Sequence, residues 1–181
     1  TYEATDKMID LIRDNYNVLQ SLSSFGIALG FGDRTVEETC RRAKVDTATF
    51  LAVVNLTING VTSMHLESLS VASLLHYLDA CHHYFIDYQL PSVRNELSSC
   101  IRHDDGIGSL ILRVYDEYAQ EIRRHMRYEQ RVLFPYVERL MSGETSTAYS
   151  IEDFARQHAE ADKSLRELKQ LIIKYLPADI D

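Results

Sequence analysis

An apolar stripe that repeats in alternating steps of four and three residues runs from Ile111 to Tyr136 and constrains the fold more than any other feature. Such spacing predicts one face of an α-helix that packs against other helices in a bundle. The members of the stripe are Ile111, Tyr115, Tyr118, Ile122, His125, Glu129, Val132 and Tyr136. Two ionisable residues, His125 and Glu129, therefore occupy positions that face a helical core.

His125 and Glu129 are four residues apart, so their side chains lie one turn above each other on a helix. Ionisable groups that are buried without a partner are costly, so something must compensate them. An imidazole nitrogen and a carboxylate oxygen in this arrangement can reach one metal ion. The alternative, which the spacing leaves open, is an ordinary local contact between the two side chains.

The composition favours an all-α protein with a sizeable core. Hydrophobic residues make up 45% of the 181 residues, whereas there are only three prolines and seven glycines. The sequence shows neither a run of apolar residues long enough to span a membrane nor a signal segment. The three scattered cysteines, Cys40, Cys81 and Cys100, fit buried thiols better than a disulfide framework. We therefore expect a cytoplasmic protein.

The first sixty residues predict short helices over 4–22, from Thr35 to about Ala43, and from Asp46 to about Asn59. Glycines interrupt the chain between the first and second of these helices. We predict a small helical domain over 1–60, followed by a helical bundle over 61–181. Short helices also occur in DNA-binding proteins, but the formal net charge of −8 makes a nucleic-acid surface an unfavourable interpretation.

Other histidines lie on the remaining predicted bundle helices. Around residues 69–90, one helical row contains His83 and a neighbouring row contains His82, and the periodicity alone does not choose between them. His103 precedes a loop signal, and His158 lies in an apolar row of the last helix. Taken singly, each is more often a surface or hydrogen-bonded histidine than a metal ligand.

A resemblance to a known family links these histidines. The segment HMRYEQRVLFPYV resembles the HMxxEExxLFP segment of hemerythrin-like proteins, in particular the di-iron family associated with iron–sulfur cluster repair. HHYFIDYQLPSV resembles that family's HHxYLRxELPxL, whose second histidine binds iron. The resemblance implies an up-down helical bundle that binds non-haem iron, with two ions if the bundle is complete. It implies the metal ligands His83, His103, His125, Glu129 and His158. Spacing alone would also allow manganese or zinc.

The N-terminal segment SFGIALGFGDRTVEETCRRAKVD resembles the small first domain of the same family. The family's adjacent cysteine pair falls on Gly30 and Phe31, so thiol chemistry proposed for that domain is not expected here. We therefore expect a packing or partner-contact role for this module, and we favour sensing, binding or storage over repair.

Three of the family's four bundle helices are expected before Leu176-Pro177. We expect the uncovered apolar seam to be filled by a further helix of a longer parent protein. The alternatives are a second copy in a homodimer, or a site that binds metal poorly or not at all. The predicted function is binding or sensing of O₂ or NO, or iron–sulfur cluster repair, under nitrosative or oxidative stress. The alternative is a helical interaction or regulatory module without a working metal site. The residues leave open whether the protein is an enzyme.

Overall fold

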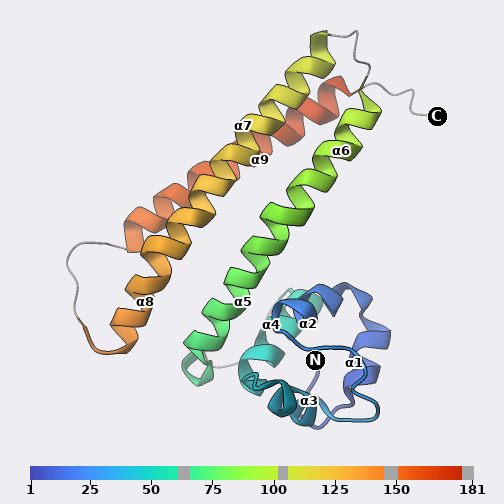
Figure 1. Cartoon of the computed structure of the whole chain (residues 1–181), viewed down its shortest axis with the longest axis vertical. Helices are drawn as coiled ribbons and strands as arrows, with labels where there is room; N and C mark the ends of the chain where they lie inside the picture. The colour runs from blue at the N-terminus through green and yellow to red at the C-terminus, as the bar shows by residue number, and fades with distance from the viewer. Residues whose placement is uncertain (61–65, 102–105, 145–150, 177–181) are drawn as a thin grey trace. The chain divides into compact units, whose positions relative to one another are not determined.

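The computed structural model describes residues 1–60, 66–101, 106–144 and 151–176. Within these ranges the chain forms helices and no β-strand, apart from one isolated bridge between Lys7 and Thr35 (Figure 1). The all-α prediction is therefore confirmed. No helix in these ranges combines the length and the apolar character that a membrane crossing requires. The chain divides into two compact units, Thr1–Cys81 and His82–Asp181.

The helices of the first unit are short. They are α1 (Met8–Asp14), the 3₁₀ turn η1 (Tyr16–Val18), α2 (Leu19–Ser24), α3 (Val36–Ala43), α4 (Thr47–Asn59), the 3₁₀ turn η2 (Leu66–Ser68) and the first part of α5 (Val71–Tyr84). The single helix predicted over 4–22 is broken at Asn15. Its side-chain amide donates to the Leu11 carbonyl at 3.0 Å, which satisfies a helix end locally and competes with continuation of the helix.

The predicted helix starts at Thr35 and Asp46 are confirmed. Thr35 and Glu38 form a capping box, in which the Thr35 hydroxyl accepts from the Glu38 N–H at 3.2 Å and the Glu38 carboxylate accepts from the Thr35 N–H at 3.0 Å. Asp46 caps α4 by accepting from the Thr49 N–H at 2.8 Å. These caps orient α3 and α4, so that residues such as Phe50 become fully buried.

The first unit has its own core, and α5 contributes to it. Tyr77 stacks on Phe25 with ring centroids 4.5 Å apart. The division between the two units falls within α5, after Cys81. The domain boundary that the sequence placed at residue 60 stays a prediction. Cys40 is completely buried in the first core, and burial raises the pKa of its thiol to about 12, which makes it unreactive.

The second unit consists of long helical rods (Figure 1). After the end of α5 come η3 (Phe85–Gln89) and α6 (Leu90–Cys100); then α7 (Gly106–Tyr128), η4 (Glu129–Leu133) and α8 (Phe134–Met141); and finally α9 (Ile151–Tyr175), which runs beside α7. The core contains the predicted stripe members Ile111, Tyr115, Tyr118 and Ile122. The Tyr115 hydroxyl also donates to the Leu90 carbonyl at 2.6 Å, which joins α7 to α6.

Two of these segments, η3 and η4, are π-helical turns that widen otherwise continuous rods. Each ends two residues before a proline, Pro91 or Pro135. A proline lacks the N–H that an α-helical turn uses, and its ring crowds the carbonyl four residues earlier. The wider π turn relieves both problems, so the helix continues past each proline. Glu129 is the first residue of η4, and the π turn therefore lies at the candidate site.

Candidate metal centre

Glu129 lies at the centre of a buried cluster in the second unit. Its side chain is 9% exposed, and each of its two carboxylate oxygens meets a different imidazole. Oε2 lies 2.9 Å from Nε2 of His82 at the end of α5, and Oε1 lies 3.1 Å from Nε2 of His125 on α7. The His82 and His125 side chains are only 10% and 11% exposed. Two helical rods therefore place three titratable groups in one water-poor position.

The electrostatics of the cluster follow from these contacts. Burial by itself raises the pKa of Glu129, but the hydrogen bonds from His125 and His82 outweigh it and lower the pKa to about 2. The hydrogen bond to Glu129 is the main reason that the pKa of His125 is raised, in opposition to its burial. The carboxylate is thus ionised at neutral pH. Positive charge from a protonated imidazole or from a cation is what this buried position favours.

A third imidazole approaches from α9. The ring centroid of His158 lies 5.5 Å from that of His125, in an edge-to-face arrangement. One ligand atom each from His125, Glu129 and His158 all lie within 4.8 Å of one another. Phe154 lies beside both histidine rings, at centroid distances of 6.4 Å and 5.7 Å. The His158 side chain is 54% exposed, and its Nδ1 lies 3.9 Å from the carboxylate of Asp162, so it stands at the open edge of the cluster.

His83, which the family resemblance selected, lies away from this cluster. Its side chain is 66% exposed, and its Nδ1 is 3.5 Å from the carboxylate of Asp87, one turn later. The structure instead brings the preceding residue, His82, to Glu129 and stacks it on Phe134 at 5.6 Å. His82 belongs to the second of the two helical rows that the periodicity left open. The apolar spacing of that row is the sequence feature that could have indicated His82.

His103 lies outside the described residues. Of the predicted ligands, the structure brings together His125, Glu129 and His158, and it adds His82 to them. The described residues of the cluster thus supply imidazoles from three helical rods and a carboxylate from one of them.

Nδ1 of His82 is buried without a hydrogen-bond partner among the described residues. An unsatisfied buried polar atom costs about 1 to 3 kcal/mol, so such atoms call for an explanation. The hydrogen bond from Nε2 to Glu129 offsets only part of the cost of burying this imidazole. A cation bound at Nε2 in place of the proton would hold the ring more strongly, but it would leave Nδ1 without a partner among the described residues.

The donor set and its spacing fit a metal ion. Imidazole nitrogens and carboxylate oxygens bind divalent metals at about 2.0 to 2.2 Å, so two neighbouring ligand atoms of one ion lie about 3 Å apart. The nitrogen–oxygen distances of 2.9 Å and 3.1 Å around Glu129 are those of hydrogen bonds, and they also match this separation. Two imidazoles with one carboxylate are also typical of non-haem Fe(II) sites.

A cavity of about 210 Å³ borders His125 on the side of α7 and α9. It is lined by Glu121, Arg124, His125, Tyr128, Gln157, Glu160 and Ala161. The cavity gives a small molecule space beside an imidazole of the cluster.

Comparisons with known proteins give a family and no individual relative. Residues 73–180 match the family described as Hemerythrin HHE cation binding domain. No curated protein and no solved structure matches the chain. The family match takes in more than half of the chain and includes His82, His125, Glu129 and His158. The chain therefore belongs to the hemerythrin HHE cation-binding family.

Proposed function

We propose that the protein binds non-haem iron through His82, His125, Glu129 and His158. The observation that carries this proposal is the buried Glu129 carboxylate, which is shared between two imidazole nitrogens at 2.9 Å and 3.1 Å. Membership of a cation-binding family supports a metal at this position, and the mixture of imidazole and carboxylate donors supports iron. His103 remains a predicted further ligand.

The use of both carboxylate oxygens supports a pair of ions rather than one. Oε2 faces His82, and Oε1 faces His125 with His158 nearby, so the two oxygens address two different sets of nitrogens. We propose that two iron ions would be held here, one by His82 and Glu129 and the other by His125, Glu129 and His158.

We further propose that the bound iron serves to bind or sense O₂ or NO in the cytoplasm under oxidative or nitrosative stress. Iron would supply an open coordination position for such a diatomic ligand. Among the chain's own residues, Glu129 balances the charge of the cations, Phe134 stacks on His82, Phe154 stacks on His125, and the cavity beside His125 gives the ligand room. Iron–sulfur cluster repair is the less favoured version, because Gly30 and Phe31 stand at the positions of the family's cysteine pair.

A groove in the second unit supports self-association. It has a volume of about 500 Å³ and a mostly apolar lining from η3, α6, α7 and α9. Tyr88 and Val93 in its wall are 59% and 47% exposed, although both are large hydrophobic residues. Apolar surface of this kind is typical of interaction sites. We propose that a second copy of the chain covers this groove in a homodimer.

The gas-binding proposal is tested with protein that is loaded with Fe(II) without oxygen and then exposed to NO or O₂. We expect a change in the visible absorption spectrum and, with NO, a new electron paramagnetic resonance signal. The variant His125→Ala removes a ligand beside the cavity and is expected to lose most of the change. Iron that binds but gives no spectral response to either gas would contradict gas binding and leave the iron site intact. Protein that takes up no iron would instead favour a helical interaction module.

A further inference from the structure

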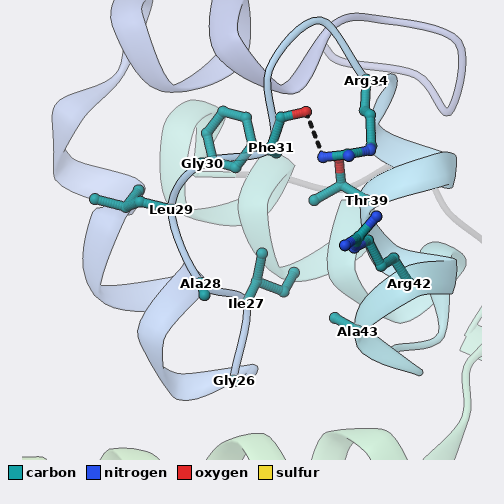
Figure 2. Close-up of a pocket in the computed structure, with 10 residues that line it drawn as sticks. All are labelled: Gly26, Ile27, Ala28, Leu29, Gly30, Phe31, Arg34, Thr39, Arg42 and Ala43. Atoms are coloured by element: carbon teal, nitrogen blue, oxygen red, sulfur yellow. Dashed lines mark hydrogen bonds between the residues drawn. The ribbon is translucent and has the colours of Figure 1, made fainter.

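The first unit contains a pocket that the proposed function does not use. It has a volume of about 340 Å³ and lies between the loop 26–31 and one face of α3 (Figure 2). The loop runs along one side of the pocket, while Arg34, Thr39 and Arg42 border it on the other side. Its volume is at the lower end of the range for small-molecule sites, about 300 to 1,000 Å³.

The charged residues of this pocket are both cations. Arg34 and Arg42 line it, and no acidic residue does. The Arg34 guanidinium donates to the Phe31 carbonyl at 2.8 Å, which holds it at the pocket (Figure 2). A guanidinium has five N–H donors, so the others on Arg34 remain available to a ligand. This pocket therefore concentrates positive charge on a protein whose formal net charge is −8.

The nearest basic residue on α3 behaves differently. Arg41 lies 3.8 Å from Glu37 in an ion pair, and it does not line the pocket. Arg42 forms no ion pair or hydrogen bond with the described residues. The unpaired arginine is thus the one that faces the cavity.

The loop beside the pocket has backbone N–H groups without acceptors. The N–H groups of Ala28, Leu29 and Gly30 have no hydrogen-bond acceptor among the described residues. Gly30 has a φ of +90°, a conformation that favours glycine and turns the chain at this point. Exposed backbone N–H groups beside guanidinium groups are a common way to bind oxyanions.

The rest of the lining is apolar. Ile27 and Phe31 are buried side chains at the pocket, and Leu29 is 69% exposed beside them. A purely inorganic anion would leave the exposed Leu29 side chain in contact with water. An organic anion would place its apolar part on Leu29 and its charged group near the arginines.

We propose that this pocket binds a small organic oxyanion, in which a phosphate or carboxylate group contacts Arg34, Arg42 and the N–H groups of 28–30, and an apolar group covers Leu29. The site lies in the first unit and is independent of the iron proposed for the second. Phosphate esters and carboxylates share the required chemistry, and the test separates them.

The test is a titration of the full chain followed by NMR of its backbone N–H groups. The probes are phenyl phosphate, benzoate, inorganic phosphate and, as the neutral control, benzyl alcohol. We expect saturable shifts at 28–30 with phenyl phosphate or benzoate, and whichever binds more tightly identifies the charged group. Inorganic phosphate and benzyl alcohol should bind at least about tenfold more weakly, because each lacks one of the two contacts.

Arg42→Met should weaken binding at least about tenfold, because it keeps the length of the side chain and removes its charge-assisted hydrogen bonds. Arg41→Met is the matched control, since it changes the neighbouring residue outside the pocket, and its affinity should stay within about twofold. Three results would overturn the proposal: an absence of shifts with both organic anions, equal binding by Arg42→Met and the wild type, or equal binding of benzyl alcohol. Equal binding of inorganic phosphate would overturn the assignment of an organic ligand.

Discussion

Substitutions of two adjacent histidines, His82 and His83, should have opposite effects on metal binding, so comparing them tests the proposed site. His82 is buried and lies 2.9 Å from Glu129, whereas the side chain of His83 is 66% exposed and lies beside Asp87. We therefore expect His82→Ala to lose most of the stabilisation that Fe(II) gives to the protein. His83→Ala should keep it.

The magnitude follows from linkage between binding and folding. A metal present at 100 times its dissociation constant stabilises the folded state by about 2.7 kcal/mol. Replacing even a residue that only orients a ligand costs about 10- to 100-fold in affinity, so we take 100-fold for losing the ligand itself. At the same metal concentration, the stabilisation of His82→Ala then falls to about 0.4 kcal/mol. For a chain of this length, these values correspond to increases in Tm of about 5 to 11 °C and about 1 to 2 °C.

The assay is thermal unfolding by circular dichroism without oxygen, with and without Fe(II), for the wild type and both variants. The increase in Tm caused by the metal is compared within each variant, so the cost of the substitution itself cancels. A loss of the increase in His83→Ala together with its retention in His82→Ala would refute the placement of His82 and favour the ligand that the family resemblance selected.

Three further predictions follow from other contacts. Without metal, the raised pKa of His125 stabilises the fold fully below pH 6.5, and this contribution is lost as the pH rises through the pKa of folded His125. The lowered pKa of Glu129 stabilises the fold fully above pH 4.5, and this contribution is lost as the pH falls towards 2. The combined contribution is therefore greatest between pH 4.5 and 6.5. Iron must displace the proton of His125, so the increase in Tm caused by iron should grow from pH 6 to pH 8, and an increase that falls over this range would contradict ligation by His125. Val93→Glu places a charge in the apolar groove and should convert a dimer into a monomer in sedimentation experiments; a wild-type protein that is already monomeric at high concentration would exclude the proposed dimer. Thr35→Ala removes the cap of α3 and should lower the free energy of unfolding in urea by about 1 kcal/mol, whereas an unchanged value would show that the capping box does not contribute.

The features that could be predicted from the sequence depend on local periodicity and capping. Ile111 and Ile122 are buried as their spacing predicts, because an amphipathic helix has only one apolar face to bury. The starts of α3 and α4 follow from side chains three residues apart, which satisfy backbone groups whatever the rest of the fold does. The same reasoning placed His125 and Glu129 together on the core side of one helix.

The features that could not be predicted depend on contacts between distant segments. His82 and His83 are neighbours on one helix, and each lies in a row of residues with helical spacing. Both rows continue into the π turn η3, which breaks the α-helical period at Phe85. Pro91 and Pro135 follow η3 and η4, but a proline in a helical pattern does not by itself specify a π turn. The pocket beside Arg42 combines a loop and a helix that no short motif connects.

The most direct test of the central claim is the metal content of the purified protein. The wild type and Glu129→Gln are each incubated with Fe(II) without oxygen, separated from free metal, and analysed by mass spectrometry of the elements. Glutamine keeps the size of the side chain but removes the negative charge and one of the two oxygens that face His82 and His125. Our account predicts stoichiometric iron in the wild type, up to two ions per chain, and little in the variant. Equal iron in both proteins, or none in either, would contradict it.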